Sequence, residues 1–181
     1  MKQLFMFFFF LCSMNVTATE QVNVNQSGVL DEGNTSVKNS DGYSPKVGIK
    51  GFVEGGYTIS DGYSDLFRLS LLATVGWQFN SNFFVGVGSG ENFYTDSKQY
   101  SIPIYADFRI NNKSLFFDVK AGYSISDIEG FYFSPSFGCR LGTKINTAFT
   151  FSLGYEYQRS NSLIDGSKNA SGLVTRIGFE F

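Results

Sequence analysis

The sequence predicts an all-β fold, an eight-stranded antiparallel up-and-down β-barrel of the transmembrane kind, formed by residues 46–181. Three observations lead to this prediction. Segments of roughly ten residues alternate apolar side chains with polar or small ones, which is the two-residue period of a strand. Short turns rich in Asn and Gly alternate with longer polar joins. After residue 18, no apolar run approaches the ~20 residues that a membrane helix requires.

The first 18 residues have the pattern of a signal peptide. Lys2 gives a short positive start, and residues 4–12 are apolar but too few to span a bilayer. Ala18 supplies the small residue that a signal peptidase requires, so we expect cleavage between Ala18 and Thr19 and export of the mature chain. An uncleaved anchor is disfavoured because polar sequence follows at once, and a lipoprotein is disfavoured because no small residue precedes Cys12.

Composition excludes several classes of function. Cleavage removes Lys2 and leaves 13 of the 14 basic residues against 16 acidic ones, which gives no reason to expect a nucleic-acid partner. One mature cysteine, Cys139, remains, so neither an internal disulfide nor a paired-cysteine metal site can form. Residues 19–45 are rich in Asn, Ser, Gly and Asp without a period, and are predicted to be a flexible periplasmic linker.

Eight amphipathic segments follow the linker, and each is near the ~9–11 residues that a tilted strand needs to cross hydrocarbon. The clearest sets Phe67, Leu69 and Leu71 on one face against Arg68 and Ser70 on the other. The predicted strands are residues 47–59, 67–79, 83–90, 101–110, 115–123, 133–141, 149–158 and 173–181.

The joins between these strands alternate in length. Short turns are predicted at residues 80–82, 111–113 and 142–146, and longer joins at residues 60–66, 92–99 and 159–170, with an intermediate one at 126–130. Short turns on one side and longer loops on the other are typical of bacterial outer-membrane barrels. An even number of strands places both ends of the barrel in the periplasm.

One face of each strand is almost unbroken in apolar side chains, and the charges lie on the other face. A soluble barrel of the lipocalin type would have its apolar face inside, whereas mixed charge on one face suits a narrow lumen filled by mutual pairing. We predict a plugged lumen, not an open pore, with Tyr105 and Phe116 as bulky fillers beside glycines. The predicted lumen network consists of Lys50, Glu54, Arg68, Asp107, Arg109, Asp118, Lys120, Arg140, Glu156, Arg176 and Glu180.

Aromatic side chains gather near the ends of the apolar faces, as in the two interfacial girdles of membrane barrels. An aromatic-rich soluble sandwich is the alternative. The girdle at the short-turn side would contain Trp77, Phe79, Phe83, Phe108 and Phe179, and the girdle at the long-loop side Tyr57, Phe67, Tyr123, Tyr155 and Tyr157.

The last predicted strand alternates Leu173, Ile177, Phe179 and Phe181 with polar or small residues, and it must pair with the first to close the barrel. We expect its inward Arg176 and Glu180 to join a lumen network that includes Glu54 and Lys50.

With these features, residues 46–181 resemble the OmpA/OmpX-type eight-stranded barrels, a family of small outer-membrane β-barrel domain proteins. The segments QFNSNFFVGVG (78–88) and GFYFSPS (130–136) also look like those of such barrels. The resemblance implies residence in the outer membrane of a Gram-negative bacterium, with outer-membrane lipid as a partner. It further implies that the barrel-assembly machinery reads Leu173, Ile177, Phe179 and Phe181. It implies little about activity, because a fold does not determine a function.

The residues give little support to catalysis. Enzymes among outer-membrane barrels generally use histidine, and this chain has none. A Ser–Lys or paired-carboxylate site remains an alternative, but Asp107, Arg109, Asp118 and Lys120 are better explained as an ion network across one hairpin. No cofactor or metal ion is expected. The predicted loop acids are more readily explained as solvated charge than as weak Ca²⁺ ligands; they are Glu91, Asp96, Asp127 and Glu129.

Three functions remain open at this stage. The favoured one is a non-enzymatic integral outer-membrane protein that stabilises the envelope or presents its extracellular loops to a partner, whose identity the sequence does not reveal. The second is a small channel or a subunit of an outer-membrane transport or secretion complex. The third is an enzyme that acts on membrane lipids.

Overall fold

The structure, a computed structural model, describes residues 46–60, 67–95, 97–142, 147–159 and 169–181. The predicted signal peptide with its Ala18–Thr19 cleavage point, the linker at 19–45 and the loop acid Asp96 lie outside these residues. The strands are β1 (Gly48–Ser60), β2 (Phe67–Gln78), β3 (Phe83–Tyr94), β4 (Tyr100–Asn112), β5 (Leu115–Ser126), β6 (Gly130–Gly142), β7 (Ala148–Arg159) and β8 (Asn169–Glu180).

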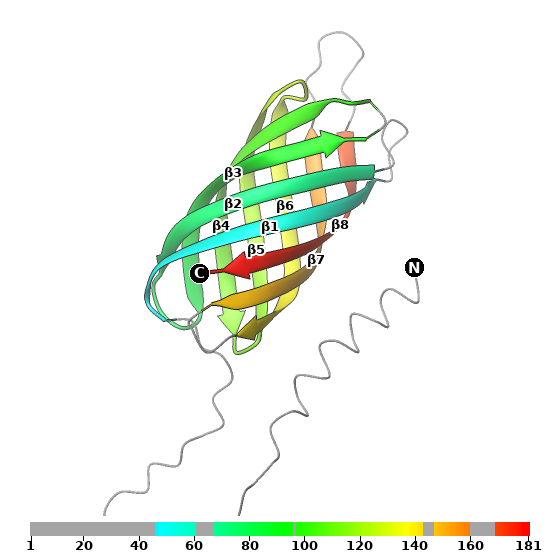
Figure 1. Ribbon diagram of the computed structural model, residues 1–181. Coiled ribbons are helices and arrows are strands. Elements are labelled where there is room, and N and C mark those ends of the chain that lie inside the picture. Colours follow the sequence, from blue (N-terminus) through cyan, green and yellow to red (C-terminus); the bar gives the residue numbers. More distant parts are fainter. Residues whose placement is uncertain (1–45, 61–66, 96, 143–146, 160–168) are drawn as a thin grey trace, which may run out of the picture. The chain divides into compact units, whose positions relative to one another are not determined.

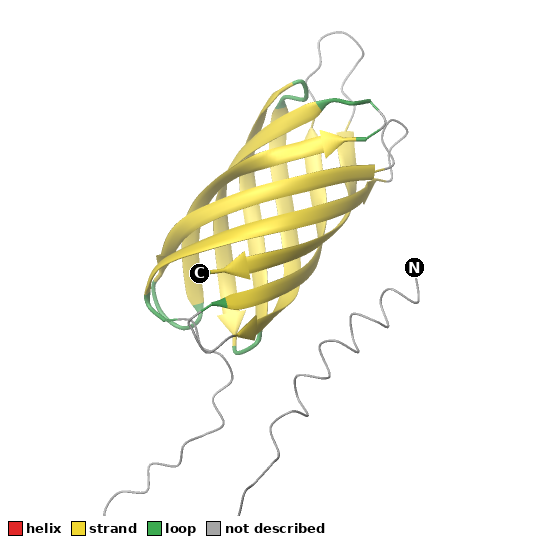
Figure 2. Cartoon of the chain, viewed as in Figure 1, coloured by secondary structure: helices red, strands yellow, loops and turns green. Residues whose placement is uncertain are grey.

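Consecutive strands pair antiparallel, and β8 pairs with β1, so the sheet closes into an eight-stranded barrel (Figure 1). All the regular structure of the described residues is strand (Figure 2). Among these residues, no helix is long and apolar enough to cross a membrane. The predicted fold class is confirmed.

The pairing register determines how steeply the strands tilt. A path that starts at Gly48 and follows paired residues through each strand in turn returns to β1 at Thr58, ten positions further along (58 − 48). With a rise of about 3.3 Å per residue and about 4.8 Å between strands, a shear of ten over eight strands gives a tilt of about 40°. Such a barrel encloses room for side chains and little else.

The two faces of the wall have opposite chemistry. Outward Val75, Val87 and Ile104 are 54%, 64% and 54% exposed, whereas inward Asp107 and Lys120 are fully buried. A soluble barrel would reverse this arrangement, because exposed apolar surface of this extent is unfavourable in water. The outward wall is therefore the surface suited to hydrocarbon, and the inward wall must satisfy its own charges.

Closure of the barrel extends to the final residue. Phe181 and Gly51 exchange two backbone hydrogen bonds, with N···O distances of 2.8 and 3.0 Å. The Phe181 ring lies over Gly51, where an added Cβ would collide with it. Gly51 thus provides the close approach that lets an aromatic ring cover the seam between β1 and β8.

Two predicted turns begin later than expected because inward side chains extend the strands. Asn111 and Asn112 belong to β4, and the turn itself is only Lys113–Ser114, with Lys113 at a positive φ of 53°. Asn111 faces the lumen, where its amide accepts a hydrogen bond from Arg140 at 3.0 Å. That bond holds Asn111 in the strand.

The same effect shortens the join predicted at residues 92–99. β3 continues to Tyr94, because Asn92 and Tyr94 face inward and bond to lumen partners. Glu91, expected in a loop, consequently lies within β3, and its side chain is on the exposed outward face. The prediction of Glu91 as a loop acid is wrong.

Bulky inward side chains fit because glycines face them. A Cβ on Gly88 would lie 2.6 Å from the Tyr105 ring, and a Cβ on Gly138 would lie 2.6 Å from the Phe116 ring. Tyr105 and Phe116 are both buried, as predicted for lumen fillers. These glycines therefore create the space that the aromatic rings occupy.

Aromatic side chains lie at both ends of the outward wall. Tyr57 and Phe67 stack at 5.7 Å between ring centroids at the end where β1 joins β2. Phe79 and Phe83 lie 6.1 Å apart at the opposite end, near exposed Trp77. This placement agrees with two belts of aromatic residues, one at each membrane interface.

Candidate functional site in the barrel lumen

The lumen holds every charged residue that the sequence assigned to it. All eleven side chains face inward and are at least nine-tenths buried. They form three groups along the barrel axis. We call them the short-turn cluster and the long-loop cluster, after the barrel end near which each lies, and the central cluster between them. The predicted assembly residues Leu173, Ile177, Phe179 and Phe181 all lie on the outward face.

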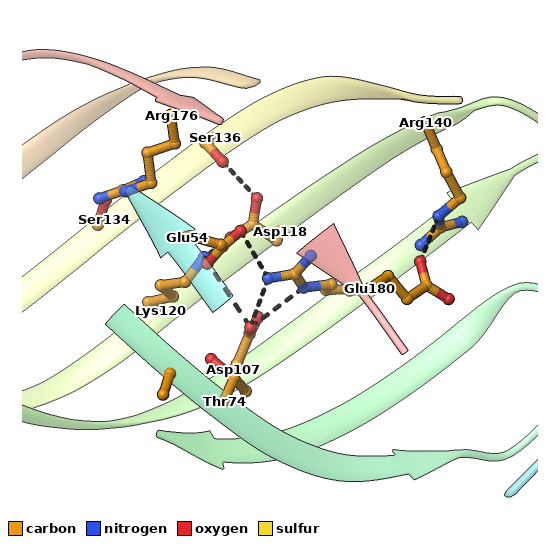
Figure 3. Close-up of polar contacts among 12 residues, drawn as sticks. Glu54, Thr74, Asp107, Asp118, Lys120, Ser134, Ser136, Arg140, Arg176 and Glu180 are labelled. Atoms are coloured by element: carbon orange, nitrogen blue, oxygen red, sulfur yellow. Dashed lines mark hydrogen bonds and ion pairs between the residues drawn. The ribbon is translucent and has the colours of Figure 1, made fainter. Parts of the chain in front are cut away.

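The central cluster joins three carboxylates to two cations (Figure 3). Arg109 Nη2 lies 2.9 Å from Glu54 Oε1 and 3.0 Å from Asp107 Oδ2. Lys120 Nζ lies 3.0 Å from Glu54 Oε2 and also contacts Asp118. Glu54 on β1 therefore bridges two cations that come from β4 and β5 across the lumen.

Register and packing position these groups. Asp107 pairs with Lys120 and Arg109 pairs with Asp118 across the β4–β5 hairpin, so opposite charges lie side by side on the inward face. The Arg109 guanidinium also lies 3.8 Å from the centroid of the Phe52 ring, in cation–π geometry. Buried charges of this kind are tolerated only when partners replace the water that they lose.

The short-turn cluster is centred on Glu180. Lys50 Nζ lies 3.2 Å from Glu180 Oε1, and Arg140 Nε lies 2.6 Å from Glu180 Oε2. Arg140 donates to Asn111, which in turn donates to Gln78 Oε1 at 3.4 Å. In Figure 3 this Arg140–Glu180 pair lies apart from the central cluster. The expected link between the closing strand and Lys50 is present.

The long-loop cluster is centred on Glu156. Its two carboxylate oxygens form ion pairs with two arginines, with Arg68 Nη2 at 2.9 Å from Oε1 and Arg176 Nη2 at 2.6 Å from Oε2. Arg176 also donates to Ser134 Oγ at 2.7 Å. Arg176 therefore makes its ion pair with Glu156 of the neighbouring strand β7.

A layer of neutral polar groups covers the long-loop cluster. Tyr94 accepts from Arg68 at 3.0 Å and donates to Gln158 Oε1 at 2.6 Å. Gln158 then donates to the backbone oxygen of Ile128 at 3.0 Å, and Ser101 donates to Gln158 at 3.3 Å. Ile128, in the link between β5 and β6, is 8% exposed, so this link folds over the lumen.

Several members of the network are neutral, and the predicted network, which consists of charged residues alone, does not include them. Their positions indicate an inward side chain, because each lies an even number of residues from a predicted inward residue of the same strand. These neutral members are Gln78, Asn92, Tyr94, Asn111, Tyr132 and Gln158.

The hydroxyl and amine groups of the central cluster contact carboxylates. Ser136 Oγ donates to the Asp118 carboxylate, and Lys120 is held by Glu54 and Asp118. Within the part of the chain that the structure describes, no three His, Cys, Asp or Glu side chains are grouped to hold a metal ion. The chemistry that this lumen supports is mutual charge neutralisation.

A closed barrel with an apolar outer wall and a charged, side-chain-filled interior defines a transmembrane β-barrel. The chain belongs to the outer membrane protein beta-barrel domain family, whose match covers residues 4–181. A solved structure described as "De novo design of transmembrane beta-barrels" is similar, with 15% identity and a TM-score of 0.45 over 77% of this chain and 98% of that one. No curated protein sequence matches the chain.

Proposed function

We propose that this protein is a non-enzymatic, closed-lumen barrel that acts through its loops or by stabilising the outer membrane. The observation that carries the proposal is the lumen network, which runs from Lys50 near the short turns to Tyr94 and Gln158 near the long loops. The cross-lumen pair between Glu54 and Arg109 lies at its centre. Such a network favours a structural barrel over a pore, since each ion pair replaces water in the path an ion would take.

Planar-bilayer conductance tests the closed lumen. The refolded barrel is expected to give no sustained single-channel openings, because the central cluster blocks the lumen. The double variant Asp107→Ala/Arg109→Ala, which shortens two oppositely charged neighbours on β4 together, is expected to conduct more often than the wild type. Sustained ion-selective openings of the wild-type barrel would instead support the channel or transport-subunit alternative.

Location and assembly form a second part of the proposal. We propose cleavage after Ala18, residence in the outer membrane of a Gram-negative bacterium, contact with its lipid, and insertion by the barrel-assembly machinery. The family and the outward position of Ile177, Phe179 and Phe181 on the closing strand support this. The extracellular partner of the loops is not identified by any described residue.

Removal of Phe181 is expected to lower the yield of folded barrel in the outer membrane at least severalfold. The residue covers the seam and pairs with Gly51, so its loss weakens closure as well as the proposed assembly signal. Heat-modifiable migration on gels measures the folded fraction, and Phe131→Ala, which removes an exposed ring away from the seam, is the control. A normal folded yield without Phe181 would contradict its role.

The absence of catalysis is likewise a proposal. It is supported by the burial of Ser136 and Lys120 and by their commitment to carboxylate partners. Unchanged lipid A and phospholipid profiles are expected when the protein is deleted from its host. A lipid species that disappears on deletion and returns with the wild-type chain would favour the lipid-enzyme alternative.

A further inference from the structure

Aromatic and charged side chains are unevenly distributed around the long-loop end of the outward wall. Three adjacent strands, β5, β6 and β7, present five rings and one cation there. On β2 and β3, by contrast, outward Leu71 pairs with the carboxylate Glu91. Among the described strand residues, Glu91 and Arg159 are the charged ones that face outward. We call the group on β5, β6 and β7 the aromatic patch: Tyr123, Phe131, Phe133, Tyr155, Tyr157 and Arg159.

The pairing register places the rings of the patch side by side. Tyr123 pairs with Phe131 across β5 and β6, and Phe133 pairs with Tyr157 across β6 and β7. The Phe131 and Phe133 rings stack with 6.2 Å between centroids and 13° between planes. Tyr155 lies two positions from Tyr157 on the same face of β7, and it is 40% exposed. The three tyrosine hydroxyls make no hydrogen bond with a described residue, so they are available to a ligand.

Arg159 completes the patch at its outer end. The register pairs Tyr132 with Gln158, so Phe131 and Arg159, one residue beyond on each strand, are outward neighbours. The two strands approach closely here, since a Cβ on Gly130 would lie 1.6 Å from the backbone oxygen of Arg159. The Arg159 side chain is exposed, and no carboxylate among the described residues pairs with it. Its guanidinium group is therefore accessible to an anionic group of the surroundings.

The depth of the patch indicates what surrounds it. Tyrosines on the wall of a membrane barrel lie near the level of the lipid headgroups. Arg159 lies four residues beyond Tyr155, which is about 13 Å along the strand and, at a tilt of about 40°, about 10 Å along the barrel axis. It therefore lies among the headgroups, while Tyr155 and Phe133 border the hydrocarbon. A cation at this level attracts anionic headgroups, whereas Glu91, four strands away around the barrel, repels them.

We propose that the aromatic patch binds the headgroup of one anionic glycolipid, with a phosphate at Arg159 and sugar hydroxyls at the tyrosines. A guanidinium group binds phosphate through two parallel, charge-assisted hydrogen bonds. Tyrosine hydroxyls both donate and accept, which suits the hydroxyls of a sugar. Phe133 gives the acyl chains an apolar contact. The site rests on the proposed residence in the outer membrane, but not on the closed lumen or on a loop partner.

Native mass spectrometry of the refolded protein in detergent micelles tests the site, with diphosphoryl lipid A as the probe. One lipid A molecule is expected to stay bound at concentrations where phosphatidylcholine, which has no net charge and no sugar, does not. Arg159→Gln removes the charge but keeps a polar side chain. It is expected to raise the apparent dissociation constant about tenfold, the value of one charge-assisted hydrogen bond. Tyr155→Phe/Tyr157→Phe keeps both rings and is expected to raise it severalfold.

Lys98→Gln is the matched control, because Lys98 is an exposed cation at the same end of the barrel but in the link between β3 and β4. It should keep the wild-type dissociation constant. Glu129→Gln removes an exposed acid from the link that precedes β6, and it should tighten binding. An unchanged dissociation constant in Arg159→Gln, an equal weakening in Lys98→Gln, or equal retention of phosphatidylcholine would overturn the site alone. Failure of the refolded barrel to insert into phosphatidylcholine vesicles would overturn the proposed membrane location, and the site with it.

Discussion

Replacing Arg109 with methionine is expected to lower the free energy of unfolding by about 3–5 kcal/mol, the cost of breaking a buried ion pair from one side. Arg109 donates to Asp107 through Nε and Nη2 and to Glu54 through Nη2. Methionine keeps much of the side-chain volume but leaves three carboxylates with Lys120 as their nearest cation. Equilibrium urea unfolding in lipid vesicles measures the loss.

Two further variants show whether charge is the cause. Arg159→Met makes the same chemical change at an exposed position on β7, where the expected effect is within about 0.5 kcal/mol. Adding Asp107→Asn to the Arg109→Met variant removes the orphaned carboxylate and should recover part of the stability. A double variant as unstable as the sum of the two single changes would show that Asp107 and Arg109 are not coupled.

Replacing Val75 with arginine is expected to destabilise the barrel by about 2–4 kcal/mol, the penalty for a cation on the lipid face near the middle of the membrane. Val75 is 54% exposed on the outward wall of β2, and it pairs with Gly51 of β1 and Val87 of β3. The same unfolding assay in vesicles measures the change.

Ile49→Arg is the matched control for depth. Ile49 is also outward and highly exposed, but it lies at the beginning of β1, where an arginine reaches the interface at a cost of about 0–1 kcal/mol. Equal tolerance of arginine at Val75 and Ile49 would argue that the outward wall faces water.

Much of this fold was predictable because two-residue alternation determines both the strand and the face of each residue. Arg68 and Asp107 alternate with apolar neighbours, so their inward position follows from parity alone. The ion pairs were less predictable, because the partner across a narrow lumen depends on register and tilt. The Glu54–Arg109 pair joins strands three apart in the sheet, and no local pattern indicates it.

Strand ends and neutral lumen residues were missed for a related reason. Asn92 and Asn111 were assigned to joins because asparagine is common in turns. In the barrel, hydrogen bonds to Arg140 and Glu156 stabilise them within strands. Tertiary contacts therefore overrode local preference at the positions where amide side chains complete a charged network.

The closed seam also determines how the barrel comes apart. Glu54 and Arg109 are 55 residues apart in sequence, and Asn92 and Glu156 are 64 apart, so these contacts across the lumen can form only when distant strands have assembled. Contacts of such long range make folding slow and loss of structure cooperative. The backbone amides of β1 and β8 should therefore exchange hydrogen only when the whole barrel opens. The barrel would then unfold as one cooperative unit, in which neither half is less stable than the other.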